Sequence, residues 1–434
     1  MSGRVLYIVY NIVLKILLLI SSPFILVLLS FRRYRTFIRQ KFGFYSSKVF
    51  SGKRRGVRIW FNAASVGEVR SIGPLIKRLK EIYPESTLFL SIGTMAGMET
   101  AEKLSLPVDE IFFSPMDVPF AVKNALSCYN PDLYITTETE IWPNFIGYSK
   151  KRGVTNLMVN GRISSVTYPR YLKIRPLIQM TLKEFELLSM RHAEDADRII
   201  NLGAPPARVK VSGNFKYDSL SESADEIPHL RPAFNLRKEE RLLVAGSTRT
   251  GEEEIILRVY KRLLFSYPDL KLLLAPRHVE RRKAIKKMVI SFGLEGIEKT
   301  EIDQGKKRER EEVIILDTIG ELFKVYSMAT VVFCGASLVR KGGQNILEPA
   351  IWGKVPLYGP HMDDFLDARR LLESVGAGIQ VRDEEDLYQN IRRLLSNPEL
   401  LEEKGRKAKE IILSQQGAVE RNANLISQLI TERL

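Results

Sequence analysis

Short apolar runs recur along this chain, each followed by a polar cluster and then by a helical pattern, and this alternation limits the folds open to it. Unbroken aliphatic and β-branched runs of this length are typical of strands buried on both faces of a parallel sheet. In the first half, strands are predicted at residues 57–64, 86–92, 132–137 and 155–160. In the second half, they are predicted at residues 242–245, 271–275, 313–316, 331–334 and 355–358. Each series predicts an α/β domain with a doubly wound parallel sheet.

A polar stretch separates the two series. Residues 219–232 contain two prolines and lack apolar periodicity, as expected for a linker. The 434 residues are enough for two domains, each able to bury its own core. We therefore expect a first domain over residues 32–225 and a second over residues 226–434. The second domain is expected to end in successive helices with charged faces, from residue 387 onward.

The chain opens with an apolar run from residue 5 to residue 31, which is followed by the basic residues Arg32, Arg33 and Arg35. This pattern predicts a membrane anchor over residues 1–31 with its basic flank in the cytoplasm. A cleaved signal peptide fits less well, because the run is long and no small-residue cleavage site follows it. Lys15 and Pro23 interrupt the run, so a full span and a shallow insertion both remain open.

The formal net charge of +15 is concentrated in this N-terminal arm. Of 66 basic residues, twelve precede Glu68, which is the first acidic residue, so 54 remain to balance 51 acidic residues. A surplus of three charges excludes a nucleic-acid-binding domain in the rest of the chain. The arm is expected to rest on anionic headgroups, each basic side chain contributing about 1 kcal/mol near the surface.

Two further features are expected to be structural. Cys128 and Cys334 lie in or beside apolar stretches, without a CxxC pair or a suitably placed His, which predicts buried, inert thiols and no metal site. Residues 301–312 are dense in charge of both signs and are expected to form a solvated loop or helix end.

Polar clusters follow the predicted strands of the first half, at the sheet edge where α/β proteins bind ligands. Residues 62–68 combine small residues with Glu68, which could also serve only to complement the dipole of a helix. Residues 136–144 place Glu138 and Glu140 close together, and helix capping accounts for one carboxylate more easily than for two. Lys216, in residues 212–218, could meet an anion or simply be solvated.

The second half contains candidates for a nucleotide site. Residues 246–254 begin like a phosphate loop but lack the Lys-Ser or Lys-Thr of an NTPase. Arg277 could pair with a phosphate, whereas His278 is better explained by packing than as a base. In residues 335–349, glycines precede a predicted helix start at Asn345, and Glu348 could accept hydrogen bonds from ribose hydroxyls.

Together these stretches resemble the Kdo (3-deoxy-D-manno-octulosonic acid) transferases, which are GT-B glycosyltransferases of family 30. The resemblance runs from the N-terminal anchor to about Asp364. It is carried by five motifs in order: Ala-Ala-Ser-Val-Gly-Glu (63–68), Thr-Glu-Thr-Glu-Ile-Trp-Pro-Asn (137–144), Gly-Asn-Phe-Lys-Tyr-Asp (213–218), Pro-Arg-His (276–278) and Gly-Gly-Gln-Asn-Ile-Leu-Glu-Pro (342–349). It implies two Rossmann-like domains that face a cleft, with an N-terminal membrane-anchoring helix.

The resemblance also implies roles for individual residues. Glu68 would be the general base, and Glu138 and Lys216 would assist the transition state. The positions that match CMP-binding residues of the family are Pro276, Arg277, Ile319, Gly320, Glu321, Asn345, Ile346, Leu347 and Glu348. The family needs neither a metal nor a cofactor. This chain departs from its pattern at Asn62 and Arg249, where the family usually has His, and at residues 334–337.

The function implied is transfer of Kdo from CMP-Kdo to the lipid A precursor, lipid IVA, in lipopolysaccharide biosynthesis, with inversion at the anomeric carbon. The first domain would bind the acceptor and the second CMP-Kdo, on the cytoplasmic face of the bacterial inner membrane. One alternative is a GT-B enzyme that uses or epimerises another nucleotide sugar. Another is a membrane-tethered binding protein without activity.

Overall fold

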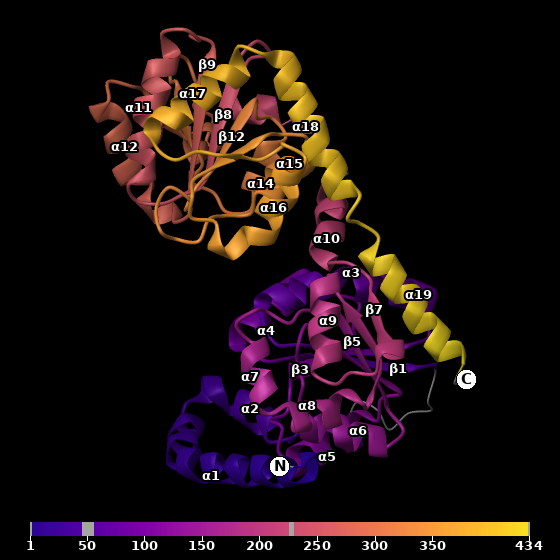
Figure 1. Ribbon diagram of the computed structural model, residues 1–434. Coiled ribbons are helices and arrows are strands. Elements are labelled where there is room, and N and C mark those ends of the chain that lie inside the picture. Colours follow the sequence, from indigo (N-terminus) through magenta and orange to yellow (C-terminus); the bar gives the residue numbers. More distant parts are fainter. Residues whose placement is uncertain (1, 46–55, 225–229, 433–434) are drawn as a thin grey trace. The chain divides into compact units, whose positions relative to one another are not determined.

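The computed structural model describes residues 2–45, 56–224 and 230–432 (Figure 1). The chain forms two compact units. The first unit consists of Met1–Ser219 with Gln416–Leu434, and the second consists of Leu220–Gln415. The boundary expected between residues 225 and 226 lies outside the described residues, as do residues 225–229 of the expected linker.

The first unit is built on a parallel sheet of seven strands in the order β3-β2-β1-β4-β5-β6-β7. Its strands are β1 (Arg58–Ala63), β2 (Thr87–Ile92), β3 (Glu110–Phe113), β4 (Leu133–Thr137), β5 (Thr155–Gly161), β6 (Phe185–Met190) and β7 (Val209–Val211). The strand order reverses between β1 and β4, which is where doubly wound sheets open a ligand crevice at their carboxyl ends.

Helices connect these strands and bury both faces of the sheet. They are α3 (Val66–Ile82), α4 (Met95–Leu104), α5 (Pro119–Tyr129), α6 (Pro143–Lys151), α7 (Tyr168–Lys173), α8 (Arg175–Leu182), α9 (Ala193–Asn201) and α10 (Phe215–Ala224). A short 3₁₀ helix, η1 (Pro206–Arg208), precedes β7. The central strand β1 is almost entirely buried, with Phe61 on one side of the sheet and Trp60 in an aromatic cluster on the other.

The second unit also has a parallel sheet of seven strands, in the order β10-β11-β9-β8-β12-β13-β14. Its strands are β8 (Arg241–Thr248), β9 (Leu270–Pro276), β10 (Gly296–Glu298), β11 (Val313–Ile315), β12 (Val331–Cys334), β13 (Pro356–Tyr358) and β14 (Ile379–Gln380). Here the order reverses between β8 and β12, so the carboxyl ends of these two strands mark the position of a possible ligand crevice.

The helices of this unit are α11 (Glu252–Leu264), α12 (Arg282–Ser291), α13 (Lys299–Asp303), α14 (Leu322–Tyr326), α15 (Leu347–Ile351), α16 (Leu366–Ser374), α17 (Glu384–Leu395) and α18 (Pro398–Leu413), with the 3₁₀ helices η2 (Arg231–Phe234), η3 (Val279–Arg281) and η4 (Asp363–Phe365). All nine strands predicted from the sequence are confirmed, with ends that differ by at most three residues. The α/β class and the two doubly wound sheets are thereby confirmed as well.

The last helix, α19 (Ala418–Thr431), belongs to the first unit, whereas residues 226–434 were expected to form the second domain. Asp218 explains the difference, because its carboxylate accepts the backbone N–H groups of Gly417 at 2.6 Å and Val419 at 2.7 Å. Arg78 of α3 pairs with Glu420 at 2.8 Å, and Ile426 packs in the core of the first unit.

The N-terminal arm forms α1 (Gly3–Ser30) and α2 (Arg32–Lys41), which Figure 1 shows in indigo at one end of the first unit. By length and composition α1 could cross or anchor in a membrane, and Pro23 lies within it without ending it. Its N-terminal half is tied to the first unit, since Tyr10 donates a hydrogen bond to Asp117 at 2.8 Å and Tyr7 donates one to Asn144 at 2.5 Å. The basic residues Lys48, Lys53, Arg54 and Arg55 lie outside the described residues.

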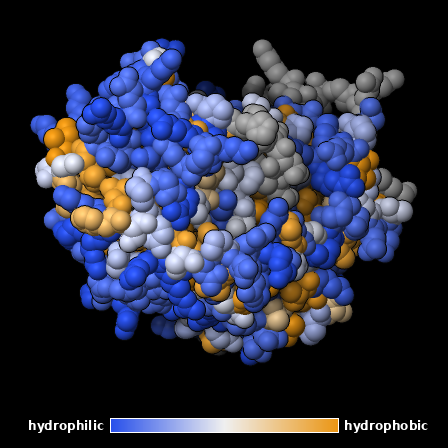
Figure 2. All heavy atoms as spheres, turned by 90° about the horizontal axis from the view of Figure 1, so that it is seen from above, coloured by the Kyte–Doolittle hydropathy of each residue, from blue (hydrophilic) through white to orange (hydrophobic). Residues whose placement is uncertain are grey.

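Exposed large apolar side chains are concentrated along α1. Exposed large apolar side chains follow one another along α1, including Ile12, Ile16, Leu19 and Leu26. By contrast, the face of the molecule drawn in Figure 2 is mainly hydrophilic, with its hydrophobic residues in small separate groups. Long apolar series of this kind indicate contact with a membrane or a partner.

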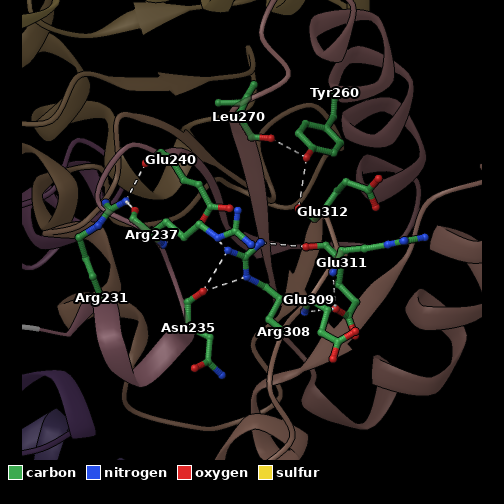
Figure 3. A network of polar contacts seen from close by, with 11 residues as sticks. Arg231, Asn235, Arg237, Glu240, Tyr260, Leu270, Arg308, Glu309, Glu311 and Glu312 are labelled. Atoms are coloured by element: carbon green, nitrogen blue, oxygen red, sulfur yellow. Dashed lines mark hydrogen bonds and ion pairs between the residues drawn. The ribbon is translucent and has the colours of Figure 1, made fainter.

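The charged stretch at residues 301–312 was expected to be solvated, and for Arg308 this is wrong (Figure 3). The Arg308 side chain is only 3% exposed and pairs with Glu240. It also donates to the Asn235 carbonyl oxygen at 3.0 Å and to the Glu311 carbonyl oxygen at 3.0 Å. Arg308 therefore ties this loop to the segment that leads into β8.

Candidate active site

Glu68 lies in the first turn of α3, directly after the central strand β1 of the first unit. Ser65 caps the helix and donates a hydrogen bond from its hydroxyl group to Glu68 Oε1 at 2.9 Å. The backbone N–H of Ala64 donates to Glu68 Oε2 at 2.9 Å. Both carboxylate oxygens are thus held at a fixed place at the carboxyl end of the sheet.

The surroundings of Glu68 change its acidity. Burial raises the pKa of Glu68, the hydrogen bond from Ala64 partly offsets this, and the nearby carboxylates Glu138 and Glu140 raise the pKa further, to about 7. A carboxylate with a pKa close to neutral is suited to accept a proton from a substrate and to release it again. The place of Glu68 in the first turn of α3 also fits the helix-dipole role that the sequence left open, and one carboxylate can serve both roles.

Glu138 follows β4 and adopts a left-handed backbone conformation, with φ of 58°. Its backbone N–H donates to the Val159 carbonyl oxygen at 3.0 Å, and its carboxylate pairs with Arg191. Arg191 in turn donates from Nε to the Asn160 carbonyl oxygen at 3.0 Å. A non-glycine residue with positive φ is energetically costly, which is characteristic of positions fixed for function.

Lys216 lies in the first turn of α10, in the third motif of the first half. The motif is anchored at the same sheet edge as Glu138, because the backbone N–H of Phe215 donates to Asn160 Oδ1 at 3.1 Å. Lys216 Nζ lies 5.1 Å from the centroid of the Tyr217 ring. Asn160 therefore connects the surroundings of Glu138 with the segment that carries Lys216.

Asn160 and Arg191 were not singled out from the sequence. Asn160 lies at the penultimate position of β5, and Arg191 directly follows β6. Asn160 itself has φ of 54°, as Asn adopts more readily than most residues. The residue type was the signal that could have found it.

A cavity of about 610 Å³ opens beside this site in the first unit. Polar side chains from the ends of β1, β2 and β3 line it, and among them Asn62 Oδ1 accepts hydrogen bonds from Ser91 at 2.8 Å and Ser114 at 2.7 Å. Asn62, one of the positions at which the resemblance implies a departure from the family pattern, thus bonds to these two serines. Ala64, the backbone partner of Glu68, also lines the cavity.

Glu140 and Lys41 add charge to this cavity. Glu140 accepts a hydrogen bond from Trp142 Nε1 at 2.6 Å. Burial raises the pKa of Glu140, with a further contribution from Glu138, while burial lowers the pKa of Lys41 to about 8. Lys41 comes from α2 and not from the strand ends that carry the other polar lining residues, so no local pattern could have indicated its place.

In the second unit, Glu252 organises the loops at the carboxyl ends of β8 and β12. Its fully buried carboxylate accepts backbone N–H groups from Arg249 at 2.9 Å, Ala336 at 2.7 Å, Ser337 at 2.9 Å and Leu338 at 3.0 Å. Glu252, in the stretch that begins like a phosphate loop, therefore binds the amide of Arg249 in its own stretch and three amides of the loop after β12. Glu252 was not predicted from the sequence as a residue that shapes the site.

The proposed nucleotide-binding residues of the second unit follow neighbouring strands. Pro276 ends β9 and Arg277 follows it, and residues 319–321 lie between β11 and α14. Residues 345–346 lead into α15, and residues 347–348 are its first two residues. Asn345 Oδ1 accepts the backbone N–H of Leu347 at 3.2 Å, and its Nδ2 donates to Glu348 at 3.2 Å. The helix begins at Leu347, two residues later than expected.

Arg249 and His278 come together at this edge, with Arg249 Nη1 and His278 Nε2 2.6 Å apart. Ile319 is almost completely exposed, and Gly320 has φ of 93°, a conformation that favours glycine. Arg277 and Ile319 thus come from the loops after β9 and β11, and Glu348 comes from the first turn of α15, the helix that follows β12.

The cysteines do not contribute to these sites. Cys334 is buried, but Cys128 is only half-buried, which corrects the expectation for that residue. Burial raises the pKa of both thiols, which keeps them in the poorly reactive protonated form. Within residues 2–45, 56–224 and 230–432, no three His, Cys, Asp or Glu side chains are grouped to hold a metal ion.

Comparisons with known proteins identify the relatives of this chain. A family model described as 3-deoxy-D-manno-octulosonic-acid transferase (kdotransferase) matches residues 36–219. The 3-deoxy-D-manno-octulosonic acid transferase of Haemophilus influenzae is 31% identical over 417 residues, which cover 94% of this chain and 96% of that protein. The enzyme of the same name from Aquifex aeolicus is 32% identical, over 81% of this chain and 90% of that protein.

Among solved structures, a UDP-N-acetylglucosamine 2-epimerase from Listeria monocytogenes covers 87% of this chain and 97% of its own, with a TM-score of 0.60 and 15% sequence identity. At this identity the likeness shows the fold alone, which is the GT-B arrangement of two Rossmann-like sheets. The likeness to the Haemophilus influenzae enzyme, by contrast, extends over nearly the whole length of both chains at 31% identity. The chain therefore belongs to the 3-deoxy-D-manno-octulosonic acid (Kdo) transferase family.

Proposed function

We propose that this transferase moves Kdo from CMP-Kdo to the lipid A precursor lipid IVA, with inversion at the anomeric carbon and without a metal ion. The observation that carries the proposal is Glu68, a buried carboxylate at the carboxyl end of β1 whose pKa is raised to about 7. Membership of the Kdo transferase family supports the transferred sugar.

Glu68 is the general base in this mechanism. Its carboxylate accepts the proton of an acceptor hydroxyl group while the oxygen of that group forms a bond to the anomeric carbon of Kdo. The bond between this carbon and the phosphate oxygen of CMP breaks on the opposite side, and CMP leaves with the bonding electron pair. Inversion follows, because one displacement occurs and no covalent enzyme intermediate is formed.

Glu138 and Lys216 assist this displacement. Positive charge develops at the anomeric centre as the bond to CMP lengthens, and the carboxylate of Glu138 stabilises it. Arg191 and the left-handed backbone hold Glu138 in place for this role. The ammonium group of Lys216 stabilises the negative charge that develops on departing CMP.

The second unit binds CMP-Kdo. Arg277 pairs with the CMP phosphate, because a guanidinium group presents two parallel donors to a phosphate. Glu348 accepts hydrogen bonds from the ribose hydroxyl groups, and Asn345 orients it through the 3.2 Å hydrogen bond. The remaining contacts come from Pro276, Ile319–Glu321 and residues 346–347. The first unit binds the acceptor.

The N-terminal arm places the enzyme on the cytoplasmic face of the bacterial inner membrane. The apolar helix α1 supplies the hydrophobic contact, and the exposed arginines of α2 lie next to it. Anionic headgroups would bind these arginines. This arrangement brings a lipid acceptor and the proposed base to the same unit.

The experiment is transfer of labelled Kdo from freshly made CMP-Kdo to lipid IVA, with and without a chelator. The native protein is compared with Glu68→Ala, Glu68→Gln and the control Glu81→Gln, an exposed residue of the same helix α3. Product with native protein and the control, but not with the Glu68 variants, supports the proposal. Near-normal transfer by Glu68→Ala would show that Glu68 is not the base.

A further inference from the structure

The cavity beside Glu68 has one wall that comes from the apolar helix α1. Leu14, Leu17, Leu18 and Ser21 of α1 line it. They continue the face of α1 on which Tyr7, Tyr10 and Asn11 contact the first unit, because positions three, four and seven residues apart lie on one side of a helix. This side of α1 therefore lies along the first unit from Tyr7 to Ser21.

The opposite side of α1 is apolar and open. Ile12, Ile16, Leu19 and Leu26 are at least half exposed, in a helix long and apolar enough for a bilayer. Asp117 and Asn144, to which the other side is bonded, belong to the folded unit and would not enter hydrocarbon. If the open side of α1 contacts the acyl region of a membrane, the helix lies between that region and the cavity.

The cavity is apolar on the side of α1 and of the aromatic cluster. Trp60, Tyr134 and Phe145 line it together with Met116 and Val118. Asp117, which also lines it, is already occupied by the hydroxyl group of Tyr10 and by the backbone N–H groups of Asn144 at 2.9 Å and Phe145 at 2.6 Å. An apolar ligand in this part of the cavity would therefore leave the Asp117 carboxylate with its hydrogen bonds intact.

On the side of the strand ends the same cavity is polar. Asn62, Glu140 and Lys41 line it here, and the backbone of Ala64 leads directly to the carboxylate of Glu68. The cavity thus joins a polar region at the proposed base to an apolar region beneath a membrane helix. Its volume of about 610 Å³ lies within the range of ligand pockets, roughly 300–1,000 Å³.

We infer that this cavity binds one fatty acyl chain of the lipid acceptor, with the chain beneath α1 and the sugar headgroup at the polar end beside Glu68. The inference rests on the proposed function for the identity of the headgroup. It assigns Leu14, Leu17, Leu18 and Trp60 to recognition of the chain. The enzyme would then favour acylated acceptors in two ways. Their acyl chain would bind in the cavity, and their partition into the membrane would raise their concentration near the enzyme.

Tryptophan fluorescence tests the inference directly. Trp60 and Trp142 line the cavity, whereas Trp352, the third tryptophan of the chain, lies in the second unit. The variant Trp142→Phe/Trp352→Phe leaves Trp60 as the sole fluorophore, and Trp60→Phe/Trp142→Phe leaves Trp352. A fatty acid with bromine on its terminal carbon, added to the full chain in detergent, is expected to quench Trp60 and not Trp352.

Matched variants of α1 show whether the quenching comes from the cavity. Leu14→Phe/Leu18→Phe narrows the cavity, and Leu19→Phe/Leu26→Phe makes the same change on the open side of the helix. In the Trp60-only background, quenching is expected to disappear in the first pair and to persist in the second. Equal quenching in both pairs, or equal quenching of Trp60 and Trp352, would overturn the inference.

Kinetics separates this inference from the proposed function. The ratio of kcat/KM for lipid IVA to that for its deacylated headgroup is expected to fall about tenfold or more in Leu14→Phe/Leu18→Phe, since each buried methylene group contributes about fourfold to binding. The ratio should not change in Leu19→Phe/Leu26→Phe. Absence of Kdo transfer by the native protein would refute the proposed function. The quenching experiment would still show whether the cavity binds an acyl chain.

Discussion

Glu68 shares its surroundings with two other carboxylates, and this grouping has a consequence for the pH dependence of the reaction. If Glu68 is the base, as proposed, it must be ionised to accept a proton, and the fraction of active enzyme should fall below its pKa of about 7. We expect kcat/KM to decrease about tenfold per pH unit below that value. The hydrogen bond from Ser65 lowers this pKa, so Ser65→Ala is expected to move the acidic limb to higher pH.

The control for this measurement is Ser71→Ala, in the same helix. The Ser71 hydroxyl donates to the backbone carbonyl oxygen of Glu68 at 3.0 Å and not to its carboxylate. Its removal should leave the acidic limb in place. An acidic limb that stays unchanged in both serine variants would argue against titration of Glu68 as its origin.

Arg191 is proposed as a positioning residue for Glu138. Its side chain is mostly buried and bridges the Glu138 carboxylate and the Asn160 carbonyl oxygen. Arg191→Met is expected to lower kcat about 100-fold, because Glu138 would no longer be fixed at the anomeric centre. Binding of CMP, measured by calorimetry, should not change, and Arg191→Lys should restore part of kcat.

Arg198→Met is the matched control, since Arg198 is also partly buried and donates to a backbone carbonyl oxygen, that of Ile163, at 2.8 Å. It should retain most of kcat. A similar loss of kcat in both variants, with a similar loss of stability, would reduce the role of Arg191 to support of the fold.

The sequence was sufficient for candidate residues next to predicted strands and insufficient for those that depend on tertiary structure. Glu68 and Glu138 follow strands whose apolar runs are obvious. Arg191 follows β6, which was not predicted, because its run is interrupted by Glu186 and Ser189. Lys41 reaches the cavity from α2, a helix of the N-terminal arm, and only the tertiary fold places this helix beside the strand ends that line the cavity.

At the level of elements, the strands that could not be predicted are short or lie toward the edges of the sheets. Strand β7 is an edge strand with two of its three residues exposed, and β10 and β14 contain three and two residues. Such strands lack the continuous apolar run of a central strand because solvent or a loop covers one side. Central strands are constrained on both faces, which is why all the strands next to β1 and β8 were predicted.

The loop that carries Arg308 is fixed by a buried ion pair, and this gives a prediction for stability. The side chain of Arg308 is 3% exposed and that of Glu240 is 10% exposed. Arg308→Met would leave the Glu240 charge buried without this partner and is expected to lower the free energy of unfolding by about 3–5 kcal/mol. Urea unfolding followed by Trp352 fluorescence, in the Trp60→Phe/Trp142→Phe background, measures this in the second unit.

Arg310→Met provides the comparison. Arg310 lies two residues further along the same loop and is exposed. Its substitution should change the free energy of unfolding by no more than about 0.5 kcal/mol. Equal urea midpoints for the two variants would show that the Arg308 network does not stabilise the unit.

On the scale of the whole molecule, charge and apolar surface are both concentrated at the N-terminus. The twelve basic residues that precede Glu68 account for most of the net charge of +15. The apolar side of α1 lies next to the exposed arginines of α2. Hydrophobic insertion and attraction to anionic lipid headgroups would therefore act on the same end of the chain.

These two contributions can be separated by vesicle binding. Arg32, Arg33 and Arg39 are exposed in α2, and their joint substitution by Gln removes three charges without changing α1. At about 1 kcal/mol per charge, partition of the full chain into vesicles that contain anionic lipid is expected to fall about 100-fold at low salt. The difference from the native protein should shrink as salt is added, because the Debye length shortens to about 8 Å at 0.15 M.

The control removes three charges from the second unit. Arg382, Arg392 and Arg393 are exposed, and their joint substitution by Gln gives the same net charge as the α2 variant. If the N-terminal arm directs binding, this control partitions like the native protein, and vesicles of neutral lipid bind all three proteins equally through α1. Equal losses in the two triple variants would mean that net charge, and not the position of the arginines beside α1, governs the attraction to the membrane.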